Sequence, residues 1–113
     1  MSERAQLGRA GEARAAAHLS ALGFEILRRN LRGPAGEIDI VAREGQTFVF
    51  VEVKARRTRR FGRALGAVDA RKRARLRAAA ADFLQFYAPD AQARFDVLTI
   101  DCEGIRLHRN AFW

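Results

Sequence analysis

The fold is decided by two stretches of sequence, EIDIVA at residues 37–42 and TFVFVEVK at residues 47–54. Residues 43–46 between them include a glycine, so the pair predicts a β-hairpin. Val, Ile and Phe occupy both phases of the alternation, which is typical of strands that are covered by helices on both faces. The hairpin therefore predicts the centre of an α/β sheet.

Two helices and three further strands are expected around this hairpin. The stretch from Arg4 to Leu22 is rich in Ala, lacks Pro and stops at Gly23, which predicts a helix. A second helix is expected from Val68 to Tyr87, with Pro89 closing it. The remaining strands are expected at Phe24–Leu27, Arg94–Ile100 and Ile105–Leu107, with a turn over residues 30–36 and a basic loop from Lys54 to Gly66. The predicted order is α-β-β-β-α-β-β, in a single domain spanning residues 1–113.

Length and cysteine content limit the class of protein. A chain of 113 residues can form one core without metal or disulfide cross-links. Cys102 is the single cysteine, so no intramolecular disulfide can form and a cytoplasmic location is expected. The first residues lack the apolar segment of a signal peptide, and no apolar run is long enough to cross a bilayer.

The positive charge is concentrated in one segment. The whole chain has a net charge of +8, but eleven Lys or Arg residues and only Asp69 as an acid lie between Lys54 and Arg77. This segment alone carries +10, and the rest of the chain carries −2. Such a concentration favours a nucleic-acid partner. The alternative is an Arg-rich helix and loop that are simply solvated.

Acidic side chains fall on one face of the predicted hairpin. Side chains two residues apart on a strand share a face, as Glu37 and Asp39 do. A turn centred on residues 44–45 places Asp39 opposite Phe50 and Glu37 opposite Glu52. Asp39 and Glu52 are then diagonal neighbours, with Cβ atoms about 7–8 Å apart or less.

A third carboxylate and a lysine accompany this pair. A helical wheel places Glu12 within the buried stripe of the first helix, where a charge needs a partner. Because Asp39 and Glu52 repel each other in an apolar setting, a cation such as Mg²⁺ (or Mn²⁺) is expected between them. Lys54 could then orient or deprotonate water, which predicts metal-assisted phosphodiester hydrolysis. The alternative is that Lys54 only neutralises Glu52 or Asp39 at the end of a strand.

The residues of the hairpin carry a family resemblance. GEIDIVA at residues 36–42 and FVFVEVKAR at residues 48–56 resemble the D…ExK core of the PD-(D/E)xK nuclease superfamily, with Ile38 in place of the Pro of its name. The whole pattern resembles the bacterial YraN-like family, which is distantly similar to archaeal Holliday-junction resolvases. Gly66 departs from it, since an acidic residue is expected there. The supporting matches are Gly8–Glu12, Asn30, Phe61-Gly62, Arg94–Val97 and Asn110–Phe112.

The resemblance implies a restriction-endonuclease-like core, in which a mixed sheet is flanked by helices. It implies that Asp39, Glu52 and the backbone carbonyl of Val53 are metal ligands. Lys54 would be the catalytic lysine, and Glu12 would contact metal-bound water or a second ion.

The sequence thus predicts a Mg²⁺-dependent DNA endonuclease, and a preference for branched or junction DNA follows from resemblance alone. The charge does not separate DNA from RNA. Two alternatives stay open: a non-catalytic nucleic-acid-binding module with the same fold, and a scaffold that docks an acidic protein. A homodimer would suit symmetric cutting, although the sequence shows no interface for it. The residues expected to hold phosphates are Arg56, Arg57, Arg59 and Arg60, with phosphate contact and solvation equally open for Lys72.

Two other features are expected to be structural. Asp96 alternates with apolar residues in a strand, which favours a cap or salt bridge over catalysis. Phe112 and Trp113 are expected to pack on the sheet or a dimer partner rather than to stack on bases.

Overall fold

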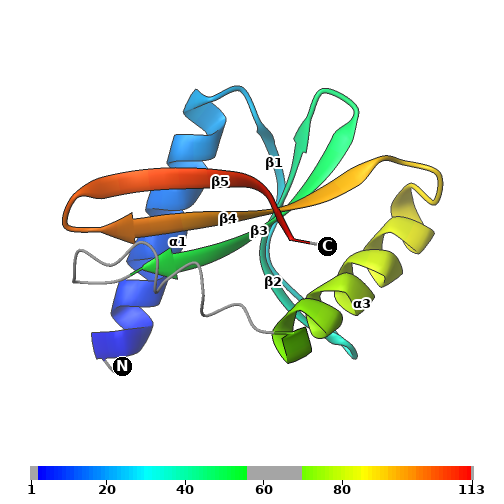
Figure 1. Ribbon diagram of the computed structural model, residues 1–113, viewed down its shortest axis with the longest axis horizontal. Coiled ribbons are helices and arrows are strands. Elements are labelled where there is room, and N and C mark those ends of the chain that lie inside the picture. The colour runs from blue at the N-terminus through cyan, green and yellow to red at the C-terminus, as the bar shows by residue number, and fades with distance from the viewer. Residues whose placement is uncertain (1–2, 56–69, 113) are drawn as a thin grey trace.

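The computed structural model describes residues 3–55 and 70–112. It has the predicted order α-β-β-β-α-β-β, so this part of the sequence interpretation is confirmed (Figure 1). None of the helices in the described ranges is long and apolar enough to cross a membrane. The elements are α1 (Glu3–Ala21), β1 (Glu25–Gly33), β2 (Gly36–Glu44), β3 (Thr47–Ala55), α3 (Ala70–Tyr87), β4 (Ala93–Asp101) and β5 (Gly104–Phe112).

The strands form one mixed sheet in the order β1-β2-β3-β4-β5. Neighbouring strands are antiparallel except β3 and β4, which are parallel. Two parallel neighbours need a crossover connection, which runs from the end of the first strand back to the edge of the sheet where both strands begin. The connection between β3 and β4 contains α3. The α/β class and the mixed sheet flanked by helices are therefore as predicted.

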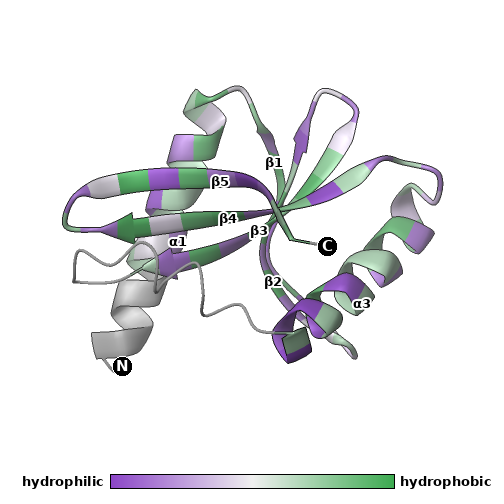
Figure 2. Cartoon of the chain, viewed as in Figure 1, coloured by the Kyte–Doolittle hydropathy of each residue, from purple (hydrophilic) through white to green (hydrophobic). Residues whose placement is uncertain are grey.

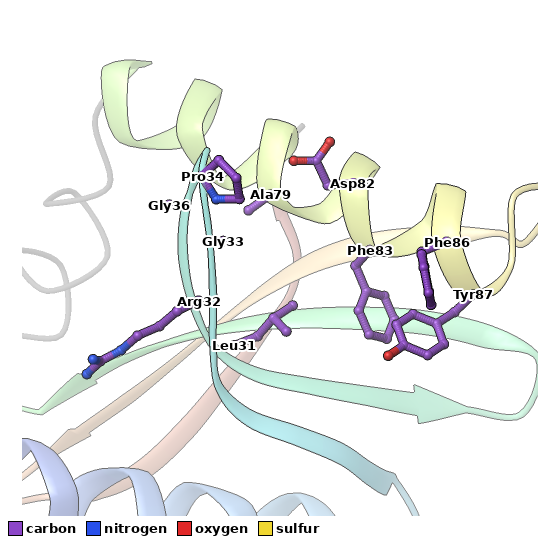
Figure 3. Close-up of a pocket in the computed structure, with 10 residues that line it drawn as sticks. All are labelled: Leu31, Arg32, Gly33, Pro34, Gly36, Ala79, Asp82, Phe83, Phe86 and Tyr87. Carbon is purple, nitrogen blue, oxygen red and sulfur yellow. The ribbon is translucent and has the colours of Figure 1, made fainter.

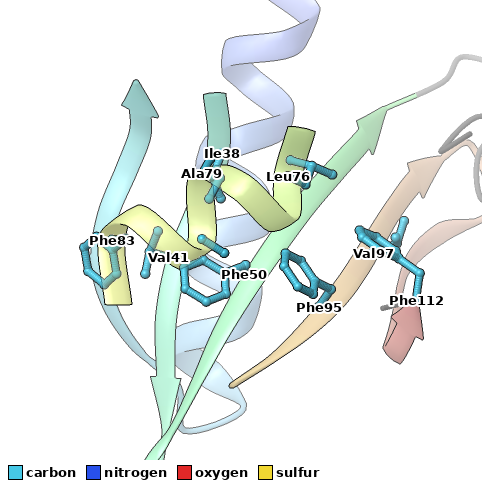
Figure 4. Close-up of a cluster of buried hydrophobic side chains, with 10 residues drawn as sticks. Ile38, Val41, Phe50, Leu76, Ala79, Phe83, Phe95, Val97 and Phe112 are labelled. Carbon is cyan, nitrogen blue, oxygen red and sulfur yellow. The ribbon is translucent and has the colours of Figure 1, made fainter. Parts of the chain in front are cut away.

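The sheet is buried on both faces, as the apolar residues in both phases of its central strands predict. One face packs against α3 and the other against α1. Figure 4 shows how Phe83 and Leu76 of α3 lie over Val41 and Phe50 of the sheet. The cluster between α1 and the sheet includes Leu19 of α1 and Ile40, Val49, Val51 and Leu98 of the strands.

The edge strands are longer than the sequence predicts. β1 continues to Gly33, so the expected turn over residues 30–36 shrinks to Pro34 and Ala35. β5 runs to Phe112, well beyond the expected Ile105–Leu107. Both strands are rich in charged residues, and their backbones are fixed by pairing with a buried neighbour rather than by their own apolar pattern.

The register of the central hairpin differs from the predicted one by two residues. Glu44 pairs with Thr47 and Val41 with Phe50, so the predicted pairing of Asp39 with Phe50 is wrong. The turn contains only Gly45 and Gln46, and the φ of Gly45, 61°, suits the first position of a two-residue loop.

A shift of two residues keeps every side chain on its face, so the predicted grouping survives the wrong register. Continuing the observed pairing by one residue beyond Ile40 and Val51 brings Asp39 directly opposite Glu52. Glu37, predicted opposite Glu52, is instead paired with Arg32 of β1.

Candidate active site

Asp39 and Glu52 come from adjacent strands at the centre of the sheet. The side chain of Glu52 is only 6% exposed. The backbone N–H of Val53 donates a hydrogen bond to Oδ2 of Asp39, at 2.8 Å. The Asp39 carboxylate is therefore fixed against β3, beside Glu52.

Two lysines neutralise Glu52. Nζ of Lys54 lies 3.2 Å from Oε1 of Glu52, and Nζ of Lys72 lies 2.5 Å from the same oxygen. Lys54 lies two residues further along β3, whereas Lys72 reaches across from the start of α3. A buried carboxylate needs such partners, because desolvation disfavours an isolated charge. The structure thus shows the ion pair of Lys54 with Glu52 and also brings Lys72 to the site.

The pKa of Asp39 reflects its burial and the negative charge of its neighbours. Burial, and then repulsion by Glu52, raise it from 3.8 to about 7, although the hydrogen bond from Val53 opposes the rise. Glu12 adds to the increase, so α1 brings the predicted third carboxylate within electrostatic range of Asp39.

Glu12 is brought near Asp39 by the close approach of α1 to β3. Gly11 is buried, and a Cβ atom built on it would lie 3.0 Å from Cβ of Ala55. That distance is too short for an ordinary contact, so glycine at this position allows the helix to pack against the end of β3. The neighbouring Glu12 is placed near the site by this contact.

The two lysines differ in proton affinity. Burial lowers the pKa of Lys54, and a hydrogen bond with Lys72 and repulsion by its charge lower it further, while Glu52 opposes the change. Burial also acts to lower the pKa of Lys72, but hydrogen bonds with Glu52 and Lys54 outweigh it, so the net shift is upward. Lys54 is therefore the lysine that gives up its proton more readily.

Asp39, Glu52 and Lys72 line a hollow of about 270 Å³ beneath the first turns of α3. That end of the helix is strongly hydrophilic (Figure 2). Lys72 and Arg75 are three residues apart on α3 and share a helix face, so both reach the hollow. Arg75 is not among the residues predicted for the site, although its i, i+3 spacing from Lys72 could have indicated it. The lining is Gly36, Glu37, Asp39, Glu52, Lys72, Arg75 and Leu76.

The oxygen donors of the site can be compared with the ligands that a divalent cation such as Mg²⁺ usually takes. In the described part of the chain, no three His, Cys, Asp or Glu side chains gather closely enough to hold an ion by themselves. Asp39 and Glu52 supply two carboxylates, and Mg²⁺ commonly takes only one or two from the protein together with water and substrate oxygens. The pKa of Asp39 is raised by burial and then by repulsion from Glu52, and a bound cation would offset both effects by stabilising the ionised carboxylate. The residues therefore fit Mg²⁺.

The remaining predicted residues divide into two groups. Asp96 is fully buried and paired with Arg94, whose Nε lies 3.0 Å from Oδ1, so its structural role is confirmed. Phe112 stacks on Phe95 with ring centroids 5.0 Å apart, which confirms that it packs on the sheet. Trp113 and the expected phosphate-binding residues Arg56, Arg57, Arg59 and Arg60 lie outside the described residues.

The fold and the site together define a small α/β protein with a D…ExK arrangement on the central strands of a mixed sheet. The chain belongs to the family described as "Uncharacterised protein family UPF0102", which matches residues 11–100. This membership confirms the resemblance to the YraN-like family. The matched region includes Glu12, Asp39 and Glu52.

Curated relatives cover most of the chain. A UPF0102 protein of Shewanella loihica is 44% identical over 111 residues, which are 98% of this chain and 97% of the relative. A UPF0102 protein of Deinococcus radiodurans is 52% identical over 100 residues, covering 86% of this chain and 81% of the relative. One from Parafrankia is 53% identical over 96 residues, covering 84% and 81%. Their names state the family and no activity.

Proposed function

We propose that this protein is a cytoplasmic, Mg²⁺-dependent endonuclease that hydrolyses phosphodiester bonds in DNA, with branched DNA as a candidate substrate. The observation that carries the proposal is that Asp39, Glu52 and Lys72 line one hollow, and that Lys54 forms an ion pair with Glu52 beside it. Two carboxylates suit a metal ion, and the lysines suit the phosphate that the ion would share. The concentration of positive charge from Lys54 to Arg77 suits a polyanion beside this hollow.

Asp39, Glu52 and the Val53 carbonyl would hold the ion. When bound, Mg²⁺ supplies Lewis-acid stabilisation of the charge that develops on the phosphoryl oxygens. Lys54 would orient the attacking water, and in its neutral amine form, which its lowered pKa favours, it would accept a proton from that water at Nζ. The water oxygen bonds to phosphorus as the bond from phosphorus to the leaving sugar oxygen breaks, and that oxygen takes a proton from solvent. Lys72 and Arg75 hold the phosphate by charge.

Glu52→Gln tests the proposal. Wild type and variant are incubated with duplex, single-stranded and four-way-junction DNA in Mg²⁺, Mn²⁺ or EDTA. We expect metal-dependent cutting by wild type, and loss of cutting with retained binding in the variant. Glu25→Gln is the control, because Glu25 is an exposed carboxylate on β1 that pairs with Arg43 away from the hollow. Absence of cutting on every substrate, or equal cutting by Glu52→Gln, would contradict the proposal.

One observation favours a second candidate, a nucleic-acid-binding module without catalysis. Lys54 and Lys72 already neutralise Glu52, so the buried carboxylate is balanced by the chain itself. Tight, salt-sensitive DNA binding with no cutting in any metal would support this candidate.

The predicted phosphate contacts of Arg57 and Arg60 can be tested in both cases. The double variant Arg57→Ala/Arg60→Ala should lower affinity for all sequences and reduce the slope of log affinity against log salt by about 2. An unchanged affinity and slope would remove these residues from the binding surface. An oligomeric state measured by analytical ultracentrifugation would decide whether the acting species is a homodimer.

A further inference from the structure

A second hollow of about 270 Å³ lies next to the carboxylate site. It is bounded by the turn between β1 and β2 on one side and by the C-terminal half of α3 on the other (Figure 3). Its apolar lining includes Leu31 from β1, Pro34 from the turn, and Ala79, Phe83, Phe86 and Tyr87 from α3. We name it the aromatic groove.

Two of its aromatic rings are exposed to solvent. Phe86 is 81% exposed and Tyr87 is 54% exposed. Their ring centroids lie 4.8 Å apart, and Tyr87 also contacts the buried Phe83 at 4.7 Å. The Tyr87 hydroxyl accepts a hydrogen bond of 3.1 Å from the guanidinium of Arg28. Tyr87 is therefore held in place by Phe83 and by Arg28, whose guanidinium also lies 5.9 Å from the centroid of the Tyr87 ring. Phe86 packs against this fixed ring and is the more exposed of the two, so it offers a surface on which a flat group can stack.

The groove is bordered by positive charge. Arg28 and Arg32 are exposed on β1; Arg28 contacts Tyr87, and Arg32 lines the groove itself. Among the described residues, Asp82 is the acid in the lining. Exposed aromatic rings beside basic side chains suit single-stranded nucleic acid, in which bases stack and phosphates need cations. A second copy of the chain fits less well, since a two-fold interface would bring these arginines face to face.

The aromatic groove and the carboxylate site lie in series along α3. Gly36 lines both hollows. Lys72 and Leu76 of α3 line the carboxylate site, and Ala79 and Phe83 line the groove. With a rise of 1.5 Å per residue, the helix carries Phe86 about 21 Å beyond Lys72. A stacked strand advances about 3.4 Å per nucleotide, so about six nucleotides separate the two positions.

We propose that the aromatic groove binds unpaired bases of a DNA strand whose backbone passes through the carboxylate site, with a base stacked on Phe86 and Tyr87. The inference rests on the proposed nuclease function and narrows its substrate class. The substrate is DNA with a single-stranded segment about six nucleotides from the bond that is cut.

Binding without metal tests the groove independently of cutting. Affinities for a single-stranded oligothymidine and for a duplex of equal length are measured by fluorescence anisotropy in EDTA. Phe86→Ala should weaken binding of the single strand at least about fivefold and change binding of the duplex less than about twofold. Leu22→Ala is the matched control, because Leu22 is also an exposed apolar residue and lies outside the groove. It should change neither affinity.

Photocross-linking locates the base. A strand that carries 5-iodouracil should cross-link to the tryptic peptide of residues 78–94, which contains Phe83, Phe86 and Tyr87. Cross-links only to other peptides, or an equal loss of single-strand and duplex affinity in Phe86→Ala, would overturn the inference. Loss of a dimer in Phe86→Ala with unchanged single-strand affinity would overturn it in favour of self-association.

The two proposals fail in different ways. If the wild type cuts DNA and Phe86→Ala does not change single-strand affinity, the proposed nuclease function stands and the proposed role of the groove is wrong. If Phe86→Ala selectively loses single-strand binding but the wild type cuts no DNA with any metal, the groove binds single strands and the proposed nuclease function is wrong. Absence of all nucleic-acid binding at moderate salt overturns both and favours a scaffold that docks a protein.

Discussion

Replacing Asp39 by asparagine tests the electrostatics of the site with almost no change in shape. The amide oxygen of asparagine can still accept the hydrogen bond from Val53, which measures 2.8 Å in the structure. The substitution removes the negative charge that burial and Glu52 disfavour. We therefore expect Asp39→Asn to raise the free energy of unfolding of the metal-free protein at high pH.

The magnitude follows from the pKa of Asp39, which rises from 3.8 to about 7 on folding. Each pKa unit corresponds to about 1.4 kcal/mol, so the full shift corresponds to about 4 kcal/mol. The folded state holds the proton more tightly than the unfolded state. The wild type is therefore most stable relative to the variant below about pH 4 and loses this stability as the pH rises through about 7. We expect Asp39→Asn to gain about 2–4 kcal/mol at pH 8.5 and almost nothing at pH 4.

Urea unfolding followed by circular dichroism, in EDTA and at several pH values from 4 to 8.5, measures the difference. Glu25→Gln is the control, because Glu25 is 57% exposed and its surface pair with Arg43 contributes at most about 1 kcal/mol. An Asp39→Asn protein that is less stable than wild type at pH 8.5 would refute the reasoning. So would a difference that stays the same at every pH.

Three further changes test other parts of the structure. Millimolar Mg²⁺ at pH 8 should raise the melting temperature of wild type, and the rise should disappear in Glu52→Gln and on adding EDTA; an equal rise in the variant would exclude Glu52 as a ligand. Gly11→Ala should lower the free energy of unfolding by about 1–2 kcal/mol in urea titrations despite its better helix propensity, because the new Cβ would lie 3.0 Å from that of Ala55. Asp96→Asn should lower the free energy of unfolding by about 1–3 kcal/mol, because it removes the buried negative charge that pairs with Arg94 and leaves that arginine with Glu44, while DNA affinity stays within about twofold; a large loss of affinity at unchanged stability would mean that Asp96 belongs to the binding surface.

Parts of the fold could be predicted because they are local properties of the chain. The glycine-terminated helix, the proline-terminated helix and the doubly buried hairpin each follow from a pattern within a short window. The ends of β1 and β5 could not be predicted in this way. Their polar residues satisfy no strand pattern, and only pairing with β2 and β4 extends them to Gly33 and Phe112.

The candidate site shows the same division. Side chains alternate between the two faces of a strand, so the positions of Asp39, Glu52 and Lys54 predict that their side chains share one face of the sheet. The structure places them together although the predicted register was wrong by two residues, because a shift of two keeps each side chain on its face. The sequence by itself therefore determined which residues share a face and how the charge is distributed along the chain.

Only the tertiary structure decided which of these groups meet. Lys72 reaches Glu52 because α3 packs across β2, and Glu12 acts on Asp39 because Gly11 lets α1 approach the end of β3. The raised pKa of Asp39 and the exposed aromatic groove depend on the same packing of helices on the sheet. Burial and charge–charge distances are set by contacts between segments far apart in the sequence, and no local pattern encodes them.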